Sequence, residues 1–107
     1  MKNDNKNLTA AEEVLLAAVN LTKNTKKEFT EWELTVWAWK LNQNRWGLRG
    51  FEDKYPDHKR VMNEVMAAGT QKIVCRGWLE RVKPNYYRLT DAGLAKAASL
   101  SNIPVDA

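Results

Sequence analysis

Two short β-rich runs on either side of a turn limit the fold of this chain more than any other feature. The runs cover 78–82 and 86–89, and the tripeptide Lys83-Pro84-Asn85 between them has residue types that favour a tight turn. Together they predict a β-hairpin. Elsewhere the apolar residues recur at helical spacing, so we expect a mainly α chain with one small hairpin, an α+β fold.

Capping residues and apolar spacing predict four helices around this hairpin. Thr9 with Glu12, and Thr30 with Glu33, form capping boxes, in which each side chain accepts a hydrogen bond from a free backbone N–H at a helix start. Asp57 is suited to cap the third helix, and Thr90 the fourth. The predicted helices span about 10–22, 31–42, 57–76 and 91–100.

The third predicted helix contains a glycine in its middle. Gly69 weakens a helix by up to about 1 kcal/mol relative to alanine, so this helix either runs unbroken from 57 to 76 or breaks near that residue. Gly77 follows the helix and enters the left-handed region without steric cost, which suits a helix end.

The helix at 31–42 is apolar on two sides, which indicates that it is covered on two sides. The stripe predicted to face the core consists of Leu34, Trp37, Ala38 and Leu41. The second stripe consists of Trp32, Val36 and Trp39. Either the following segment, 43–56, or another subunit would cover the second stripe. We expect that segment to be an ordered loop with room for a short strand, because it carries four large apolar residues that favour burial: Trp46, Leu48, Phe51 and Tyr55.

The positive charge of the chain is concentrated in its middle. The net charge is +4 overall, yet residues 40–88 alone carry eleven basic and five acidic residues. A basic segment of this kind is typical of a protein that binds a polyanion, although an ordinary solvated surface would carry it too.

Other classes of function find little support in the sequence. One histidine, His58, and one cysteine, Cys75, are too few for a four-ligand zinc site, and no catalytic or nucleotide-binding motif occurs, so we expect no metal, no cofactor and no enzyme activity. The length of 107 residues suits one domain, predicted at 9–100 between tails at 1–8 and 101–107. We expect no membrane contact and a cytoplasmic location, because the sequence has no apolar run of about 20 residues and no signal core.

The last third of the chain resembles winged helix-turn-helix proteins of the type found in small bacterial and phage regulators. The residues that carry the resemblance are RGWLERV at 76–82 and YYRLTDAG at 86–93, within 57–95. The resemblance implies a three-helix core, a recognition helix at about 57–76, a wing at 78–89 and a C-terminal helix. The segment 46–57 is not part of that pattern.

The resemblance also implies that the partner is double-stranded DNA and that the chain is a transcriptional regulator or a DNA-targeting module. Residues at the start of a recognition helix meet bases, whereas later ones and the wing meet phosphates. The basic and aromatic segment 45–49 also suits phosphate contact. The candidate DNA-binding residues are Arg45, Arg49, Lys59, Arg60, Asn63, Lys72, Arg76, Lys83, Asn85 and Arg88.

Several alternatives remain open from the sequence. The polar side chains on the third helix would equally suit an ordinary solvated surface, and those of the wing would suit any polar hairpin turn. Arg45 and Arg49 could instead form ion pairs with Glu52 or Asp53. The tryptophan-rich helix at 31–42 could instead serve protein–protein contact, and a homodimer is a further option.

Overall fold

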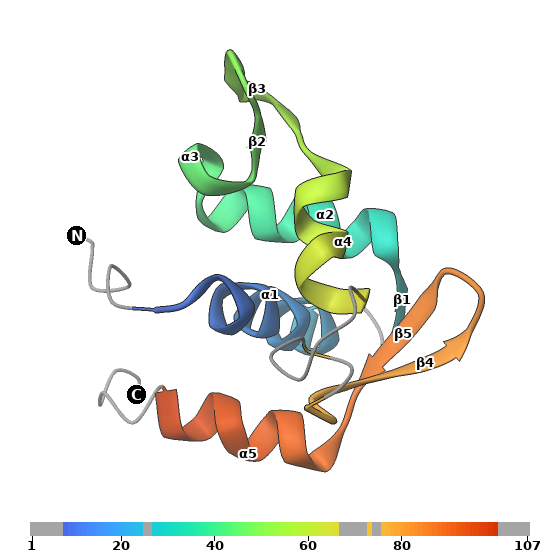
Figure 1. Ribbon diagram of the computed structural model, residues 1–107. Helices are drawn as coiled ribbons and strands as arrows, with labels where there is room; N and C mark the ends of the chain where they lie inside the picture. Colours follow the sequence, from blue (N-terminus) through green and yellow to red (C-terminus); the bar gives the residue numbers. More distant parts are fainter. Residues whose placement is uncertain (1–7, 25–26, 67–72, 74–75, 101–107) are drawn as a thin grey trace.

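The computed structural model describes residues 8–24, 27–66, 73 and 76–100. This part of the chain forms five helices and two small antiparallel sheets, which confirms the α+β class (Figure 1). In chain order the elements are α1 (Ala10–Asn24), β1 (Glu28–Thr30), α2 (Glu31–Leu41), α3 (Gln43–Trp46), β2 (Gly47–Leu48), β3 (Phe51–Pro56), α4 (His58–Met66), β4 (Leu79–Lys83), β5 (Tyr86–Leu89) and α5 (Asp91–Leu100).

Both predicted capping boxes are present. The N–H of Glu12 donates to Thr9 Oγ1 at 3.1 Å, and the N–H of Thr9 donates to Glu12 Oε1 at 3.0 Å. At the start of α2 the corresponding distances between Thr30 and Glu33 are 3.1 and 2.8 Å. Local hydrogen bonds therefore fix both helix starts where the sequence placed them.

Of the two alternatives for the third helix, the unbroken one from 57 to 76 is wrong. The N–H of Ile73 donates to the carbonyl oxygen of Glu64 at 3.0 Å, nine residues earlier, whereas a helix would join it to a residue four positions back. The described part of this helix, α4, ends at Met66, and Gly69 lies outside the described residues. Gly77 has a φ of +79°, the predicted left-handed conformation, and leads into β4.

The main sheet has three antiparallel strands in the order β1-β5-β4. The predicted hairpin forms its β4–β5 part, with a register shift between Arg81 and Lys83. Strand β1 was not predicted, because its three residues lie in a polar connection and only Phe29 is apolar. Phe29 pairs with Tyr87 of β5, and both side chains are buried.

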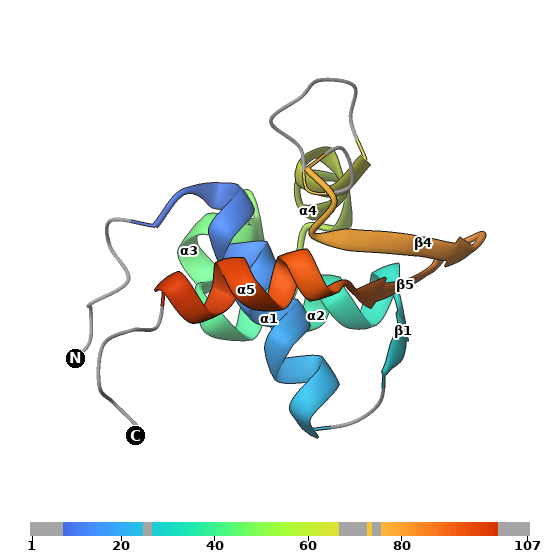
Figure 2. The same cartoon turned by 90° about the horizontal axis from the view of Figure 1, so that it is seen from below.

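Helix α1 lies at the centre of the helical layers. It packs against α2 on one side and α5 on the other, and it also contacts α4 (Figures 1 and 2). The core is built from small and aliphatic residues of α1 with larger ones from the other elements. None of the described helices is long and apolar enough to cross a bilayer.

The predicted core face of α2 is correct in part. Leu34 and Ala38 are buried and Trp37 is half-buried, but Leu41, the last residue of the helix, is 46% exposed. The most buried of the tryptophans is Trp46, which is 1% exposed, followed by Trp78 at 7%.

The segment 43–56 forms α3 and a second hairpin, β2–β3, which projects from the end of the molecule next to α2 and α4 (Figure 1). The expectation that its large apolar residues are buried is correct only for Trp46; Leu48, Phe51 and Tyr55 stay exposed. Strand β3 covers Trp39 of the second α2 stripe, whose indole Nε1 donates to the carbonyl oxygen of Glu52 at 2.6 Å. Trp32 of the same stripe remains 51% exposed.

Candidate nucleic-acid interface

Helix α4 presents one polar face to solvent. Asp57 precedes the helix and its Oδ1 accepts a hydrogen bond from the N–H of Arg60 at 3.2 Å. Val61 and Val65, one turn apart, bury the opposite face in the core. The exposed residues of the helix are His58, Lys59, Asn63 and Met66.

The β4–β5 hairpin lies beside this helix, and one face of it is turned toward α4 (Figure 2). Tyr87 of β5 donates a hydrogen bond from its hydroxyl to Met66 Sδ at 2.8 Å. Burial raises the pKa of Tyr87, as does the negative charge of Glu31, whereas Arg81 lowers it. Arg81 pairs directly with Tyr87 across the ladder and is exposed. Because directly paired residues share a face, Arg81 lies on the α4 side of the hairpin.

The other face of the hairpin carries Arg88. Arg88 pairs in register with Glu80 and Glu28, and its Nε lies 3.2 Å from Glu80 Oε1. It lines a pocket with Asp91 and Leu94 of α5. Arg88 is therefore engaged with a carboxylate on the face of the sheet turned away from α4.

The two candidate residues at the hairpin turn are exposed and held in place. Asn85 has a φ of 72°, and its carbonyl oxygen accepts a hydrogen bond from the N–H of Glu31 at 2.9 Å, which ties the turn to α2. The Nζ of Lys83 lies 4.5 Å from the centre of the Tyr86 ring. Lys83 thus keeps its charge near the tip of the hairpin.

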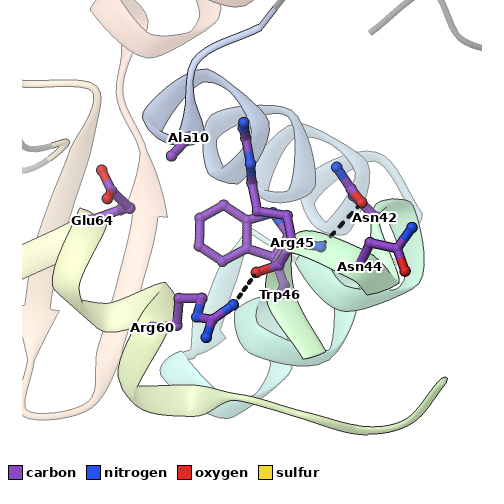
Figure 3. Close-up of a pocket in the computed structure, with 7 residues that line it drawn as sticks. All are labelled: Ala10, Asn42, Asn44, Arg45, Trp46, Arg60 and Glu64. Carbon is purple, nitrogen blue, oxygen red and sulfur yellow. Dashed lines mark hydrogen bonds between the residues drawn. The ribbon is translucent and has the colours of Figure 1, made fainter. Parts of the chain in front are cut away.

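Arg45 and Arg60 hold α3 against its neighbours. Arg60 Nη1 of α4 donates a hydrogen bond to the carbonyl oxygen of Arg45 at 2.9 Å. Figure 3 shows the two residues in a shallow pocket that Trp46 also lines. Arg45 Nη1 lies 3.2 Å from Oε2 of Glu13 in α1. The sequence had suggested Glu52 or Asp53 as the partner of Arg45, so that expectation is wrong for Arg45. Both arginine side chains are 39% exposed, so each combines a structural contact with a solvent-facing part.

The remaining candidates lie apart from α4 or outside the described residues. Arg49 is exposed in the β2–β3 hairpin. The guanidinium group of Arg76 lies 4.8 Å from the centre of the Trp78 ring, which is a cation–π distance. Lys72 lies outside the described residues, as does Cys75.

The structure therefore brings Lys59 and Asn63 together on α4 and places Arg81 on the facing side of the hairpin. Sequence reasoning did not single out Arg81. The signal was present, because Leu79 and Arg81 are two positions apart in one strand and so share a face. Strand alternation therefore puts Arg81 on the same face of β4 as Leu79, which is buried.

Among the described residues, no group of three or more His, Cys, Asp or Glu side chains could hold a metal ion. Comparison of the chain with models of protein families, with curated proteins and with solved structures finds no match.

Proposed function

We propose that the chain is a winged-helix domain that binds duplex DNA, as a transcriptional regulator or as the DNA-targeting part of a larger system. Helix α4 enters the major groove and the β4–β5 hairpin is the wing. The order of the elements supports the fold: α1, β1, α2 and α4 precede the hairpin, and β1 joins it in one antiparallel sheet. The order of the helices and the hairpin is the one expected from the resemblance of 76–93 to winged-helix proteins, whereas β1 was not expected.

The observation that carries this proposal is the alignment of Lys59 and Asn63 with Arg81 around one solvent-facing helix. An α-helix fits the major groove, where an asparagine amide pairs with adenine through two hydrogen bonds. Lysine and arginine neutralise the flanking phosphates and set the position of the helix. Asn63 is assigned to base contact, and Lys59 and Arg81 to the backbone of the DNA.

The other candidates take secondary roles in this arrangement. Lys83 and Asn85, at the hairpin tip, reach the backbone on the outer side of the wing. Arg60 fixes the start of α4 through its contacts with Asp57 and with the carbonyl oxygen of Arg45. The exposed part of its guanidinium group is assigned to the edge of the major groove. Arg88 is not assigned to DNA contact, because it pairs with Glu80 on the opposite face.

Fluorescence anisotropy with a labelled random-sequence duplex tests the proposal. Affinity should fall steeply between roughly 50 and 200 mM salt, with a slope in log K against log salt of about −0.9 for each phosphate neutralised. Replacing Lys59 and Arg81 by alanine together should reduce that slope by about 2. The matched control is Lys23→Ala, an exposed lysine in the last turn of α1, which should leave affinity unchanged. No binding at low salt would overturn the proposal.

A second candidate function, a protein–protein interaction module, is favoured by one observation. Trp32 is 51% exposed on α2, and exposed tryptophans are common at the centres of protein interfaces. A chain that does not bind DNA at low salt and whose Trp32→Gln variant loses a protein partner would support this alternative.

A further inference from the structure

Glu31, the first residue of α2, contacts both α4 and the β4–β5 hairpin. Its backbone N–H donates a hydrogen bond to the carbonyl oxygen of Asn85, in the turn of the hairpin, at 2.9 Å. Its carboxylate Oε1 lies 2.7 Å from Nε2 of His58, the first residue of α4. Because a carboxylate only accepts hydrogen bonds, the imidazole N–H is the donor. One residue therefore joins the start of α4 to the turn of the hairpin.

The carboxylate of Glu31 is largely shielded from water. Its side chain is 13% exposed, whereas that of His58 is 44% exposed. The negative charge of Glu31 also acts on Tyr87 of β5, where it is the second cause, after burial, of the raised pKa of the phenol. The carboxylate is thus close to both elements. Its low exposure makes the hydrogen bond from His58 stronger than the same bond in open solvent.

Further contacts hold α4 at both of its ends. The ring of His58 stacks on Trp32, the residue after Glu31, with 6.2 Å between ring centres and 20° between ring planes. At the end of α4, the Tyr87 hydroxyl donates to Met66 Sδ at 2.8 Å. The hairpin therefore touches the end of α4 directly, whereas the contact described above between the hairpin turn and the start of α4 passes through Glu31.

The residues proposed to meet DNA lie directly beside these contacts. Lys59 follows His58 in α4, and Lys83 lies two residues before Asn85 at the hairpin turn. The phosphates of a duplex have a fixed spacing, so basic groups on two elements can meet them together only if the two elements keep a fixed separation. Binding groups are held at such a separation by the contacts of the residues behind them. Glu31 makes contacts of this kind to both elements.

We propose that Glu31 is a positioning residue, which holds the start of α4 and the hairpin turn at the separation that duplex DNA requires. The inference rests on the proposed DNA-binding function. Glu31 is not assigned to DNA contact, because its carboxylate is bonded to His58 and its charge repels phosphates. Its role depends on the hydrogen-bond acceptor Oε1 rather than on the negative charge.

A charge effect and a positioning effect of Glu31 would change DNA affinity in opposite directions. If Glu31 contributed only a negative charge near the DNA, its removal would raise the affinity for a polyanion. If Glu31 positions α4, removal of the acceptor lowers the affinity even though a negative charge is lost. Glutamine separates the two effects, because its amide oxygen accepts the same hydrogen bond without the charge.

Fluorescence anisotropy with the random-sequence duplex tests the inference. Glu31→Ala should weaken binding by about fivefold, the effect of losing one hydrogen bond. Glu31→Gln should bind at least as tightly as the wild-type chain. His58→Ala should act in the same direction as Glu31→Ala, and the double variant should lose less than the product of the two effects, because both changes remove one contact. The inference is wrong if Glu31→Ala does not weaken binding, or if Glu31→Gln weakens it as much.

The matched control for these titrations is Glu28→Ala. Glu28 lies three residues before Glu31, and it pairs in register with Arg88 on the face of the sheet turned away from α4. Its replacement removes the same charge without touching His58 or Asn85, so it should not weaken DNA binding. A loss as large as that of Glu31→Ala would overturn the inference.

A distance measurement without DNA separates the inference from the proposed function. Spin labels on Asn63→Cys and Lys83→Cys, in a chain that also carries Cys75→Ser, report the separation of α4 and the hairpin turn by electron paramagnetic resonance. The distance distribution should stay narrow with Glu31→Gln and become broader with Glu31→Ala.

Circular dichroism checks that each labelled variant is folded, and His58→Ala replaces Glu31→Ala if that variant is not. An unchanged distribution after loss of the contact would overturn the inference even if the wild-type chain binds DNA. A broader distribution in a chain that does not bind DNA would support the positioning of α4 by Glu31 and overturn the proposed function instead.

Discussion

The indole Nε1 of Trp46 donates a hydrogen bond to Oε1 of Glu13 at 3.0 Å, and this bond joins α3 to the central helix α1. The same carboxylate accepts a hydrogen bond from Asn42 Nδ2 at 3.1 Å and lies 3.2 Å from Arg45 Nη1. Glu13 is 8% exposed, so its charge is almost fully removed from water. Three donors from one short segment compensate that burial and fix the base of the β2–β3 hairpin.

Glu13→Ala should destabilise the fold, because it leaves the donors of Trp46 and Asn42 without an acceptor. Breaking hydrogen bonds to a buried charge costs about 2–3 kcal/mol, after allowance for the partial exposure of Arg45. Urea unfolding measures the change. Glu80→Ala removes an exposed carboxylate from an ion pair and is the control, with an expected loss below about 0.5 kcal/mol. Equal losses in the two variants would contradict the role assigned to Glu13.

Trp46, rather than Trp37, should be the tryptophan on which stability depends most. Trp46→Ala empties a fully buried site and should cost about 3–5 kcal/mol. Trp37 is only half-buried, with Lys40 Nζ 5.4 Å from its ring centre, so Trp37→Ala should cost at least about 1 kcal/mol less. Thermal melts of both variants give the order, and a larger loss for Trp37→Ala would be inconsistent with the packing described.

The raised pKa of Tyr87 predicts a loss of stability at alkaline pH. Burial, the first cause of the shift, favours the protonated phenol in the folded state over the unfolded state, where the pKa is near 10.0. The stabilising contribution is complete below that value and is lost as the pH rises through the folded-state pKa. Urea unfolding between about pH 9 and pH 11 should show this loss. Tyr87→Phe should lose less stability over the same interval, and parallel curves would refute the assignment.

Arg81 and Arg88 form a matched pair for testing which face of the wing meets DNA. Both are exposed arginines of the same hairpin, but only Arg81 shares the face of Tyr87 that is turned toward α4. Arg81→Ala should lower DNA affinity and reduce the salt slope by about 1, whereas Arg88→Ala should change neither. Anisotropy titrations at several salt concentrations measure both. An effect of Arg88→Ala as large as that of Arg81→Ala would place the DNA on a different surface.

The elements that could be predicted from the sequence are those that local interactions specify. Thr9, Thr30 and Thr90 cap helices by hydrogen bonds within three residues, and the turn at Pro84-Asn85 fixes the β4–β5 hairpin. Strand β1 could not be predicted in the same way, because it depends on a distant partner: Phe29 pairs with Tyr87. For the third helix the local pattern left two alternatives open, and the bond from Ile73 back to Glu64 excludes the unbroken one.

The candidate site was predicted less completely than the fold, for a related reason. Arg45 and Arg88 are basic and near the expected surfaces, yet each pairs with a carboxylate, Glu13 or Glu80. Which carboxylate an arginine meets depends on how α1, α3 and the sheet are packed, and no local pattern reports that. The exposure of Phe51 and Tyr55 likewise follows from the way the β2–β3 hairpin projects, since a hydrophobicity pattern alone favours their burial.

The position of β5 at the centre of the main sheet determines when this chain can finish folding. Strand β1 is made early in synthesis, but its only strand neighbour in the order β1-β5-β4 is made near the end of the described chain. Helices α1 and α2 can pair as soon as they leave the ribosome, whereas Phe29 must wait for Tyr87. Contacts between residues so far apart in sequence form slowly, so closure of the sheet should set the folding rate. Until β5 has been synthesised, the edge of β1 has no strand partner in the nascent chain.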